Sequence, residues 1–379
     1  MNIPELLEGR RVCVCAGSGG VGKTTAAAAI ALGMAARGGR VAVVTIDPAR
    51  RLADALGLEQ LSNEPSRVDP GRLAGFEVTG ELWAMMLDSK RTFDELIDRI
   101  APSPARAAEI KANRVYRELS TAVSGSQEFT AVSKLYELST EGDFDLLVLD
   151  TPPSRNALDF LEAPGRLTSF LEGRALKTFI RPTGLGMRFL GGGARPLLGG
   201  LRRLTGLDLV TDLTTFFGLL GDMTANFGER ARQVERLLRS DETAFLLITS
   251  AQSEPVDEAL WFGRTLHEGG LPFGGIVVNR FHHDLDRDAL EPEPSQALGG
   301  VLGDDLAARV AATLADYHVL AERDAANVAR LTRSLPDVPL LLVPHLDGEV
   351  HDVEGLLRIC RYLFASDSER FRLIADVVA

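Results

Sequence analysis

The sequence predicts an α/β protein built on a doubly wound, mostly parallel sheet. Short apolar runs recur along its 379 residues, and each is long enough for one buried strand. The first two runs flank an alanine-rich helical segment, and such a βαβ unit gives parallel strands that are covered on both faces. Most of the runs end in a polar residue, and open α/β sheets bind their ligands at these carboxyl ends.

The elements can be placed in order along the chain. A strand over residues 11–16 leads into a loop, and the helix expected over residues 23–37 ends at Gly38 and Gly39, because glycine readily adopts the conformation that closes a helix. A second strand follows over residues 41–46. The other strands are expected at residues 82–87, 146–149, 245–248, 275–278 and 340–343. The sheet is therefore predicted to have six or seven strands.

Two stretches interrupt this alternation. Residues 89–140 have the pattern of helices with a break at Pro102 and Pro104, and residues 166–238 mix Leu, Phe and Met with Arg and many glycines. We expect these stretches to fold together as a helical insertion subdomain. The core would then comprise residues 1–88, 141–165 and 239–379.

Composition limits the function classes. The chain has 41 Lys and Arg against 53 Asp and Glu, a net charge of −12, so no nucleic-acid partner is expected. Its three cysteines are too few for a disulfide framework and fit a reducing compartment. We find neither a secretory signal nor an apolar run of the roughly 18–20 residues that a spanning helix needs. A cytoplasmic protein is expected.

The clearest motif is a glycine-rich loop between the first strand and the following helix. Residues 17–24 read Gly-Ser-Gly-Gly-Val-Gly-Lys-Thr and match the phosphate-loop pattern G-x-x-x-x-G-K-[ST]. Backbone N–H groups and the positive end of the helix dipole would bind phosphate oxygens there. Lys23 would reach the β- and γ-phosphates, and the Thr24 hydroxyl would bind Mg²⁺. A glycine turn without a ligand is the alternative. The expected nucleotide-binding residues are Gly17, Ser18, Gly19, Gly20, Val21, Gly22, Lys23, Thr24 and Thr25.

Two aspartates at strand ends complete the predicted site. Asp150 follows the run 146–149 and is expected to hold Mg²⁺ directly or through water, although it could instead cap a following helix. Asp47 follows the second strand, and hydrolysis needs a group that orients the attacking water. Asp47 and Lys23 are therefore the predicted catalytic residues. From position alone, Asp47 could equally be the N-cap of a helix over residues 51–56.

These motifs resemble those of the SIMIBI-class deviant-phosphate-loop ATPases, most closely the ArsA-type, arsenical-pump-driving branch that includes the eukaryotic tail-anchored-protein targeting ATPase. Residues 47–56 look like the switch I of that family, and residues 150–153, Asp-Thr-Pro-Pro, look like its switch II. The related MinD and ParA ATPases share the loop and the Asp-Thr-Pro-Pro segment, but residues 47–54 favour the ArsA side. The resemblance implies a dimeric ATPase that uses ATP and Mg²⁺, with Asn279 as an adenine contact and residues 344–350 near the base.

The loop departs from the family pattern at Ser18. In the family this position normally carries a lysine that reaches the phosphates of the partner subunit, and a cation supplied in this way can raise the rate by about 10³–10⁵-fold in the arginine-finger analogy. Another cation, from Arg50, Arg51 or Arg155, could substitute for it. Alternatively, the chain is a weakly hydrolysing, nucleotide-binding regulatory subunit in a heterodimer with a lysine-bearing paralog.

The cysteines and histidines offer weaker metal candidates. Cys13 and Cys15 lie two apart on the first strand, so we expect them on one face as packing residues rather than as an arsenite or zinc site, while Cys360 lies in a late helix. His282 and His283, with three aspartates close behind them, could bind a metal, but a solvated loop is favoured.

The apolar side chains between residues 170 and 227 raise the question of cargo. Phenylalanine and methionine on adaptable helices suit a groove for apolar protein cargo or a membrane partner. The equal alternative is that they pack on the helices of residues 90–140.

Overall fold

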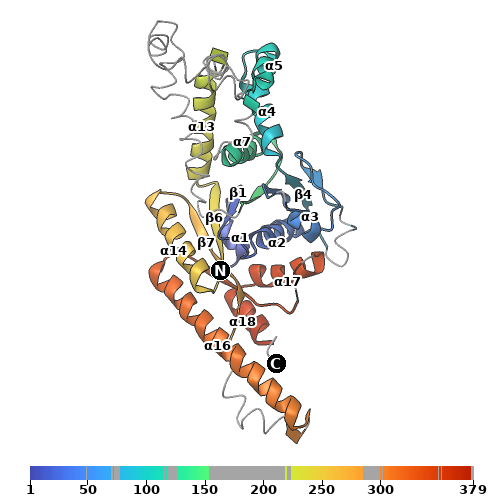
Figure 1. Cartoon of the computed structure of the whole chain (residues 1–379), viewed down its shortest axis with the longest axis vertical. Coiled ribbons are helices and arrows are strands. Elements are labelled where there is room, and N and C mark those ends of the chain that lie inside the picture. The colour runs from blue at the N-terminus through green and yellow to red at the C-terminus, as the bar shows by residue number, and fades with distance from the viewer. Residues whose placement is uncertain are drawn as a thin grey trace, which may run out of the picture.

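An eight-stranded sheet with helices on both faces forms the centre of the molecule (Figure 1). The computed structural model describes residues 1–47, 49–69, 71, 77–114, 116–117, 126–152, 218–219, 223–284, 299–300, 302–348, 350 and 352–376. The strand order is β3-β4-β2-β5-β1-β6-β7-β8, and all neighbours run parallel except β3 and β4. The predicted doubly wound α/β fold is confirmed.

All the predicted strands are present, with ends that differ from the expected ones by one to three residues. One further strand, β3, consists of two exposed residues that pair antiparallel with β4, so no apolar run marks it in the sequence. The strands are β1 Val12–Ala16, β2 Arg40–Thr45, β3 Ser66–Arg67, β4 Glu81–Met86, β5 Leu146–Asp150, β6 Thr243–Ser250, β7 Phe273–Phe281 and β8 Leu340–Pro344.

The helices follow the expected alternation, and several begin at a side chain that caps them. Asp88 accepts a hydrogen bond from the backbone N–H of Arg91 at the start of α4, and Asp352 does the same for Gly355 at the start of α17. The described helices are α1 Ile3–Leu6, α2 Lys23–Ala36, α3 Arg51–Ala55, α4 Ser89–Ile100, α5 Pro104–Ala112, α7 Ser126–Glu141, α13 Thr224–Arg239, α14 Ser253–Glu268, α16 Asp304–Ser334, α17 Val353–Phe364 and α18 Asp367–Asp376.

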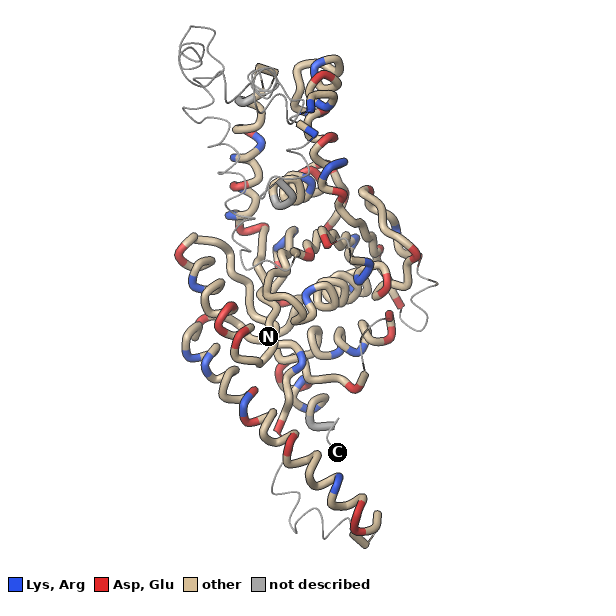
Figure 2. The backbone as a smooth tube through the Cα atoms, viewed as in Figure 1, with Lys and Arg blue, Asp and Glu red and all other residues tan. Residues whose placement is uncertain are grey.

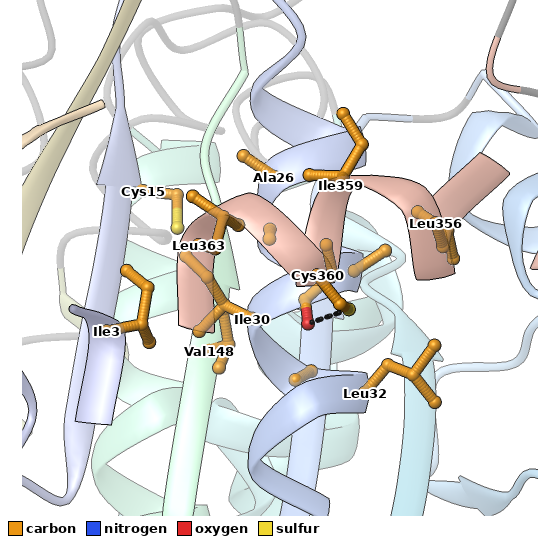
Figure 3. Packing of buried hydrophobic residues seen from close by; sticks show 14 of the residues in the cluster. Ile3, Cys15, Ala26, Ile30, Leu32, Val148, Leu356, Ile359, Cys360 and Leu363 are labelled. Carbon is orange, nitrogen blue, oxygen red and sulfur yellow. Dashed lines mark hydrogen bonds between the residues drawn. The ribbon is translucent and has the colours of Figure 1, made fainter. Parts of the chain in front are cut away.

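Each face of the sheet has its own apolar core. Side chains of β1 alternate between them, so Val12 and Val14 join the core under α7, α13 and α14, while Cys13 and Cys15 join the core under α2 and α17 (Figure 3). The helix α2 is rich in alanine and is buried between the sheet and α17, where its small side chains pack beside Ile30 and Leu32.

The cysteines are packing residues, as the sequence predicts for Cys13 and Cys15. All three are buried free thiols, and the two sulfur atoms on β1 lie 4.0 Å apart. Cys360 donates a hydrogen bond to the carbonyl of Ala29 at 3.2 Å (Figure 3). Burial raises the pKa of Cys360 to about 12, and the bond to Cys13, together with burial, raises the pKa of Cys15. Protonated thiols are poor metal ligands.

The helices of the predicted insertion rise together from one end of the sheet (Figure 1). They share an apolar cluster of their own, which includes Ile97 of α4, Phe129 of α7 and Phe227 of α13. Leu135 and Val234 also reach the core beneath the sheet, so α7 and α13 anchor this cluster to it. The domain boundaries remain a prediction, because residues 153–217 lie outside the described part of the chain.

Part of the apolar cargo stretch packs internally. Leu219, Met223 and Phe227 are buried against the helices of residues 89–141, which agrees with the packing alternative for these three side chains. The other apolar residues of the stretch lie outside the described residues. No helix in the described part of the chain has the length and apolar character needed to cross a bilayer. Acidic and basic residues alternate with other residues along the described helices (Figure 2).

Candidate nucleotide-binding site

The glycine-rich loop lies between the carboxyl end of β1 and the first turn of α2, where the sequence places it. Two of its glycines are required by the backbone. Gly17 and Gly22 have φ angles of 149° and 94°. A β-carbon on Gly17 would collide with the carbonyl oxygen of Ile248, and one on Gly22 would collide with the Asn279 amide. The neighbouring strands β6 and β7 therefore press directly on the loop, and only glycine fits there.

Lys23 folds back over the loop that precedes it. Its ammonium group donates a 2.6 Å hydrogen bond to the carbonyl oxygen of Ser18, and only 6% of the residue is exposed. Burial lowers the pKa of Lys23, while the charges of Asp150 and Asp47 act in the opposite direction. The buried charge is thus held in the loop next to two carboxylates, ready to meet an anionic ligand.

Asp150 is the centre of a buried hydroxyl–carboxylate cluster. Its Oδ2 accepts hydrogen bonds from the hydroxyl of Thr24 at 2.8 Å and from that of Thr45 at 2.9 Å. Asp150 is fully buried, and its Oδ1 has no hydrogen-bond partner among the described residues. An unpaired carboxylate oxygen beside a threonine hydroxyl fits Mg²⁺, which prefers oxygen ligands. Thr24 and Asp150 are therefore brought together as a magnesium site requires.

Asp47 lies at the end of β2 but does not cap α3. The N-cap of α3 is Arg50, while Asp47 Oδ1 accepts a 2.9 Å hydrogen bond from the backbone N–H of Ala49. The capping alternative is therefore wrong, because the chain makes an extra turn before the helix begins. Arg51 lies 3.7 Å from the Asp47 carboxylate. The catalytic role of Asp47 remains a prediction.

A pocket of about 440 Å³ adjoins the far end of the loop. Gly22, Thr25 and Asn279 line one side, and the loop 344–350 lines the other. Asn279 is 7% exposed and donates a 2.9 Å hydrogen bond to the carbonyl oxygen of Val21, so it also holds the phosphate loop in place. The structure thus brings Asn279 and residues 344–350 together, and their contact with a base stays a prediction.

Two residues of the site are absent from the sequence-based prediction. The hydroxyl of Thr45 donates to the same Asp150 oxygen as that of Thr24. A polar side chain at the end of an apolar strand could have identified Thr45 from the sequence. Arg280 donates a 3.4 Å hydrogen bond to the carbonyl oxygen of Gly20. Its φ of 57° is the one positive value at a non-glycine position in the described ranges. No sequence pattern predicts this backbone conformation for an arginine.

Other metal candidates gain no support. Within the described residues, no group of three His, Cys, Asp or Glu side chains could hold a metal ion. Of the three aspartates after His283, two lie beyond the described residues. Of the cations suggested as a substitute for the missing lysine, Arg51 is exposed and pairs with Asp47, and Arg155 is outside the described residues.

Comparison with known proteins decides the family. The family model described as an anion-transporting ATPase, ArsA_ATPase, matches residues 10–292. The chain belongs to this ArsA ATPase family. Family membership supports a nucleotide-dependent ATPase and agrees with the geometry of the loop.

The relatives of this ArsA-family chain are distant, and two of the three described here span more than two thirds of it. An uncharacterized protein of Streptomyces coelicolor is 27% identical over 91% of the chain and 78% of its own length. The ATPase get3 of Schizosaccharomyces japonicus is 26% identical over 71% of the chain and 74% of its own length. A putative arsenical pump-driving ATPase of Halobacterium salinarum is 30% identical over 44% of the chain and 26% of its own length.

The burial of Asp150 predicts a pH-dependent stability of the metal-free chain. Burial raises the pKa of Asp150 from 3.8 to about 6, so the folded state binds the proton more tightly than the unfolded state. The contribution of this group to stability is therefore full below pH 4 and declines as the pH rises towards 6, by roughly 3 kcal/mol in all. Asp150→Asn should remove this decline, so in a chelator its stability advantage over the parent should grow from pH 4 to pH 6.5.

Denaturant unfolding at a series of pH values measures this difference. Asp143→Asn is the matched control, because the Asp143 carboxylate precedes the same strand and its side chain is 97% exposed. Parallel pH profiles for the parent and the Asp150→Asn variant would contradict the prediction.

Proposed function

We propose that the chain binds ATP with Mg²⁺ at the phosphate loop and hydrolyses it. The observation that carries this proposal is the Thr24–Asp150–Thr45 cluster, in which a buried carboxylate keeps one oxygen unpaired next to the loop. Thr24 and Asp150 would hold Mg²⁺, which supplies positive charge to the phosphates when it is bound. The loop amides and Lys23 would hold the phosphate oxygens.

Asp47 is the proposed group that orients the attacking water. Its backbone N–H donates a 3.2 Å hydrogen bond to Thr45 Oγ1, so it is linked to the residue that contacts Asp150. Its side chain is 16% exposed, which leaves the carboxylate accessible to a water molecule at the rim of the site. A carboxylate so placed would accept a hydrogen bond from water and align it with the terminal phosphate.

Substitutions at these positions should separate binding from chemistry. Lys23→Ala removes the charge that meets the phosphates, so ATP binding and phosphate release should both fall, the latter by about 10²-fold or more. Asp47→Asn should lower kcat by a similar factor while ATP still binds, because Asp47 is assigned to the water. Phosphate release and ATP calorimetry measure the two effects, and Asp54→Asn, which changes an exposed carboxylate on the short helix α3 that follows Asp47, is the control. Normal turnover by Lys23→Ala would contradict the assignment of the site.

We further propose that nucleotide state is passed to the helical insertion through the segment after Asp47. The loop that follows α3 carries Asn63, which is 4% exposed and binds residues at the start of α4 and on that helix. Its Oδ1 accepts hydrogen bonds from the backbone N–H of Asp88 at 2.8 Å and from the Thr92 hydroxyl at 2.9 Å. Its amide also donates to Glu95 at 3.2 Å. A shift at the Asp47 segment would therefore reach α4 through buried polar contacts.

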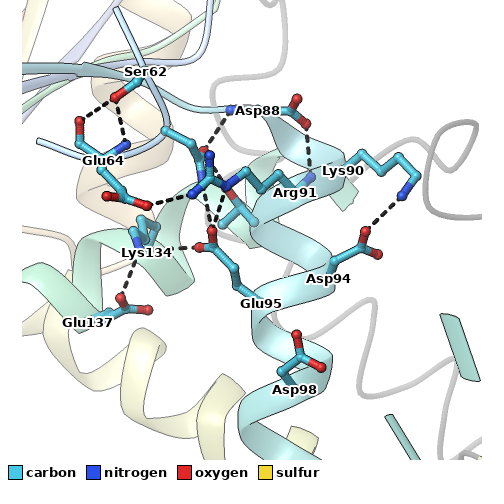
Figure 4. Close-up of polar contacts among 12 residues, drawn as sticks. Ser62, Glu64, Asp88, Lys90, Arg91, Asp94, Glu95, Asp98, Lys134 and Glu137 are labelled. Carbon is cyan, nitrogen blue, oxygen red and sulfur yellow. Dashed lines mark hydrogen bonds and ion pairs between the residues drawn. The ribbon is translucent and has the colours of Figure 1, made fainter. Parts of the chain in front are cut away.

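Ion pairs extend this connection to α7. Glu95 of α4 accepts from Arg91 at 3.0 Å and lies 3.4 Å from the ammonium group of Lys134, whose side chain is only 8% exposed (Figure 4). Lys134 also donates to Glu137 at 2.8 Å. Because the partly buried charges share one network, α4 and α7 would move together.

Hydrogen exchange tests this coupling. Saturating ATP and Mg²⁺ should change amide protection in α4 and α7 relative to ADP, because the terminal phosphate would alter the Asp47 segment. The helix α14, which packs on β6 and β7, serves as an internal control that should change little. The Lys23→Ala chain should show no nucleotide-dependent difference. Equal protection of α4 and α7 in ATP and ADP would remove the coupling proposal.

We also propose that the chain acts as a dimer, because it resembles a family in which a loop lysine reaches the partner subunit. We further propose that the insertion handles apolar cargo or a membrane partner. Ser18 favours a second candidate, a weakly hydrolysing regulatory subunit paired with a lysine-bearing paralog. Its side chain carries no charge, and the contact that it contributes to Lys23 comes from its backbone carbonyl.

The Ser18 candidate makes a specific prediction for the purified chain. If Ser18 limits hydrolysis, Ser18→Lys should restore a cation and raise the rate of phosphate release at least about tenfold, since such trans cations are worth up to about 10⁵ in rate. Ser18→Ala is the matched control and should leave the rate unchanged. A fast parent enzyme that Ser18→Lys does not accelerate would refute the regulatory candidate and leave the ATPase proposal intact.

A further inference from the structure

A second pocket of about 420 Å³ lies against residues 19–21 of the phosphate loop, and its walls come from the ends of β6 and β7 and from α16. It is separate from the pocket at Asn279, although Arg280 and His345 line both. The roles proposed above assign no ligand to this pocket, and Arg280 has been described only for its bond to the loop.

Asp324 of α16 holds two of these side chains in place. Asp324 is only 1% exposed. Its Oδ2 accepts a hydrogen bond from the backbone N–H of His282 at 3.0 Å and lies 2.8 Å from the Nδ1 of the same histidine. Oδ1 accepts two bonds from the guanidinium of Arg323, at 3.0 and 2.7 Å. A buried carboxylate is costly unless it is paired, and this one is paired on both oxygens. Its bonds fix the direction of Arg323 and His282.

The pocket therefore carries a net positive charge in a chain whose overall charge is −12. Arg280 and Arg323 both line it, and its one carboxylate, Asp324, is already occupied. His345 stacks on His282 with 4.9 Å between ring centres, and burial and the charge of His282 lower the pKa of His345. The two imidazole rings add nitrogen donors and acceptors without adding negative charge.

The phosphate loop supplies the remaining wall. Gly19 and Gly20 are exposed at the pocket, and Arg280 bonds to the Gly20 carbonyl, so the guanidinium is held at the loop. Ser250 and Gln252 add a hydroxyl and an amide from the end of β6. Two guanidinium groups together with neutral donors are the usual partners of a phosphate group.

We propose that this pocket is a second phosphate-binding site, formed by Arg280, Arg323 and His282 beside the phosphate loop. Its ligand is a phosphate group, either free inorganic phosphate or the phosphate of a small phosphomonoester, for which 420 Å³ leaves room. This site does not depend on ATP hydrolysis by the chain.

Calorimetry on the Lys23→Ala chain isolates the pocket, because that change removes the charge of the phosphate loop. Inorganic phosphate is the first probe and glycerol phosphate the second. Addition of Arg280→Gln or Arg323→Gln should weaken the binding of either probe by at least roughly tenfold, as expected for loss of a charge-assisted hydrogen bond. The probe that binds more tightly identifies the source of the phosphate.

Arg330→Gln is the matched control. Arg330 lies on α16 like Arg323, its side chain is equally 41% exposed, and it pairs with Asp257 away from the pocket. It should leave phosphate binding unchanged. Arg280→Gln leaves Asp324 and its partners intact, so it tests the site even if Arg323→Gln lowers the melting temperature. Absence of binding by both probes, or binding that neither arginine substitution weakens, would overturn the proposal, whatever the ATPase assays give.

Discussion

The buried carboxylate of Asp150 connects β5 to β2 through Thr45 and to the start of α2 through Thr24. It stands at the end of β5, in register with Thr45 of β2 on one side and Cys15 of β1 on the other, and it accepts the hydroxyl of Thr24 at the start of α2. Such a group in an apolar interior is tolerated only when hydrogen bonds or a cation compensate its charge. The two threonines satisfy one oxygen, and the other has no hydrogen-bond partner among the described residues.

The phosphate loop is also held in place by residues of the neighbouring strands. Asn279 holds the Val21 carbonyl from β7, and Ile248 of β6 leaves no space for a side chain on Gly17. The neighbouring strands β6 and β7 therefore help to fix the loop, in addition to its own glycines. A preformed phosphate cradle needs less reorganisation when the ligand arrives.

Sequence reasoning reached the fold and most of the proposed site because both rest on local patterns. The strand runs, the glycine-rich loop and the aspartate at the end of residues 146–149 are visible without a structure, since parallel strands put their carboxyl ends at one edge. The role of Asp47 was ambiguous because a strand-end aspartate and an N-cap look alike in a sequence. Only the structure shows that Arg50 caps α3 and so excludes the capping alternative. Arg280 could not be predicted from the sequence because its position depends on a left-handed backbone conformation. Asp324 could not be predicted because it contacts His282, which lies 42 residues away in the chain.

The burial of the cysteines also has a practical side. None of the three thiols of the chain reaches the surface, and the raised pKa values of Cys15 and Cys360 keep those two as poorly nucleophilic thiols. Two cysteines engineered on exposed helices would therefore react with maleimide dyes far faster than the native ones. The unaltered background makes the protein a convenient scaffold for fluorescence measurements of distance between its two ends.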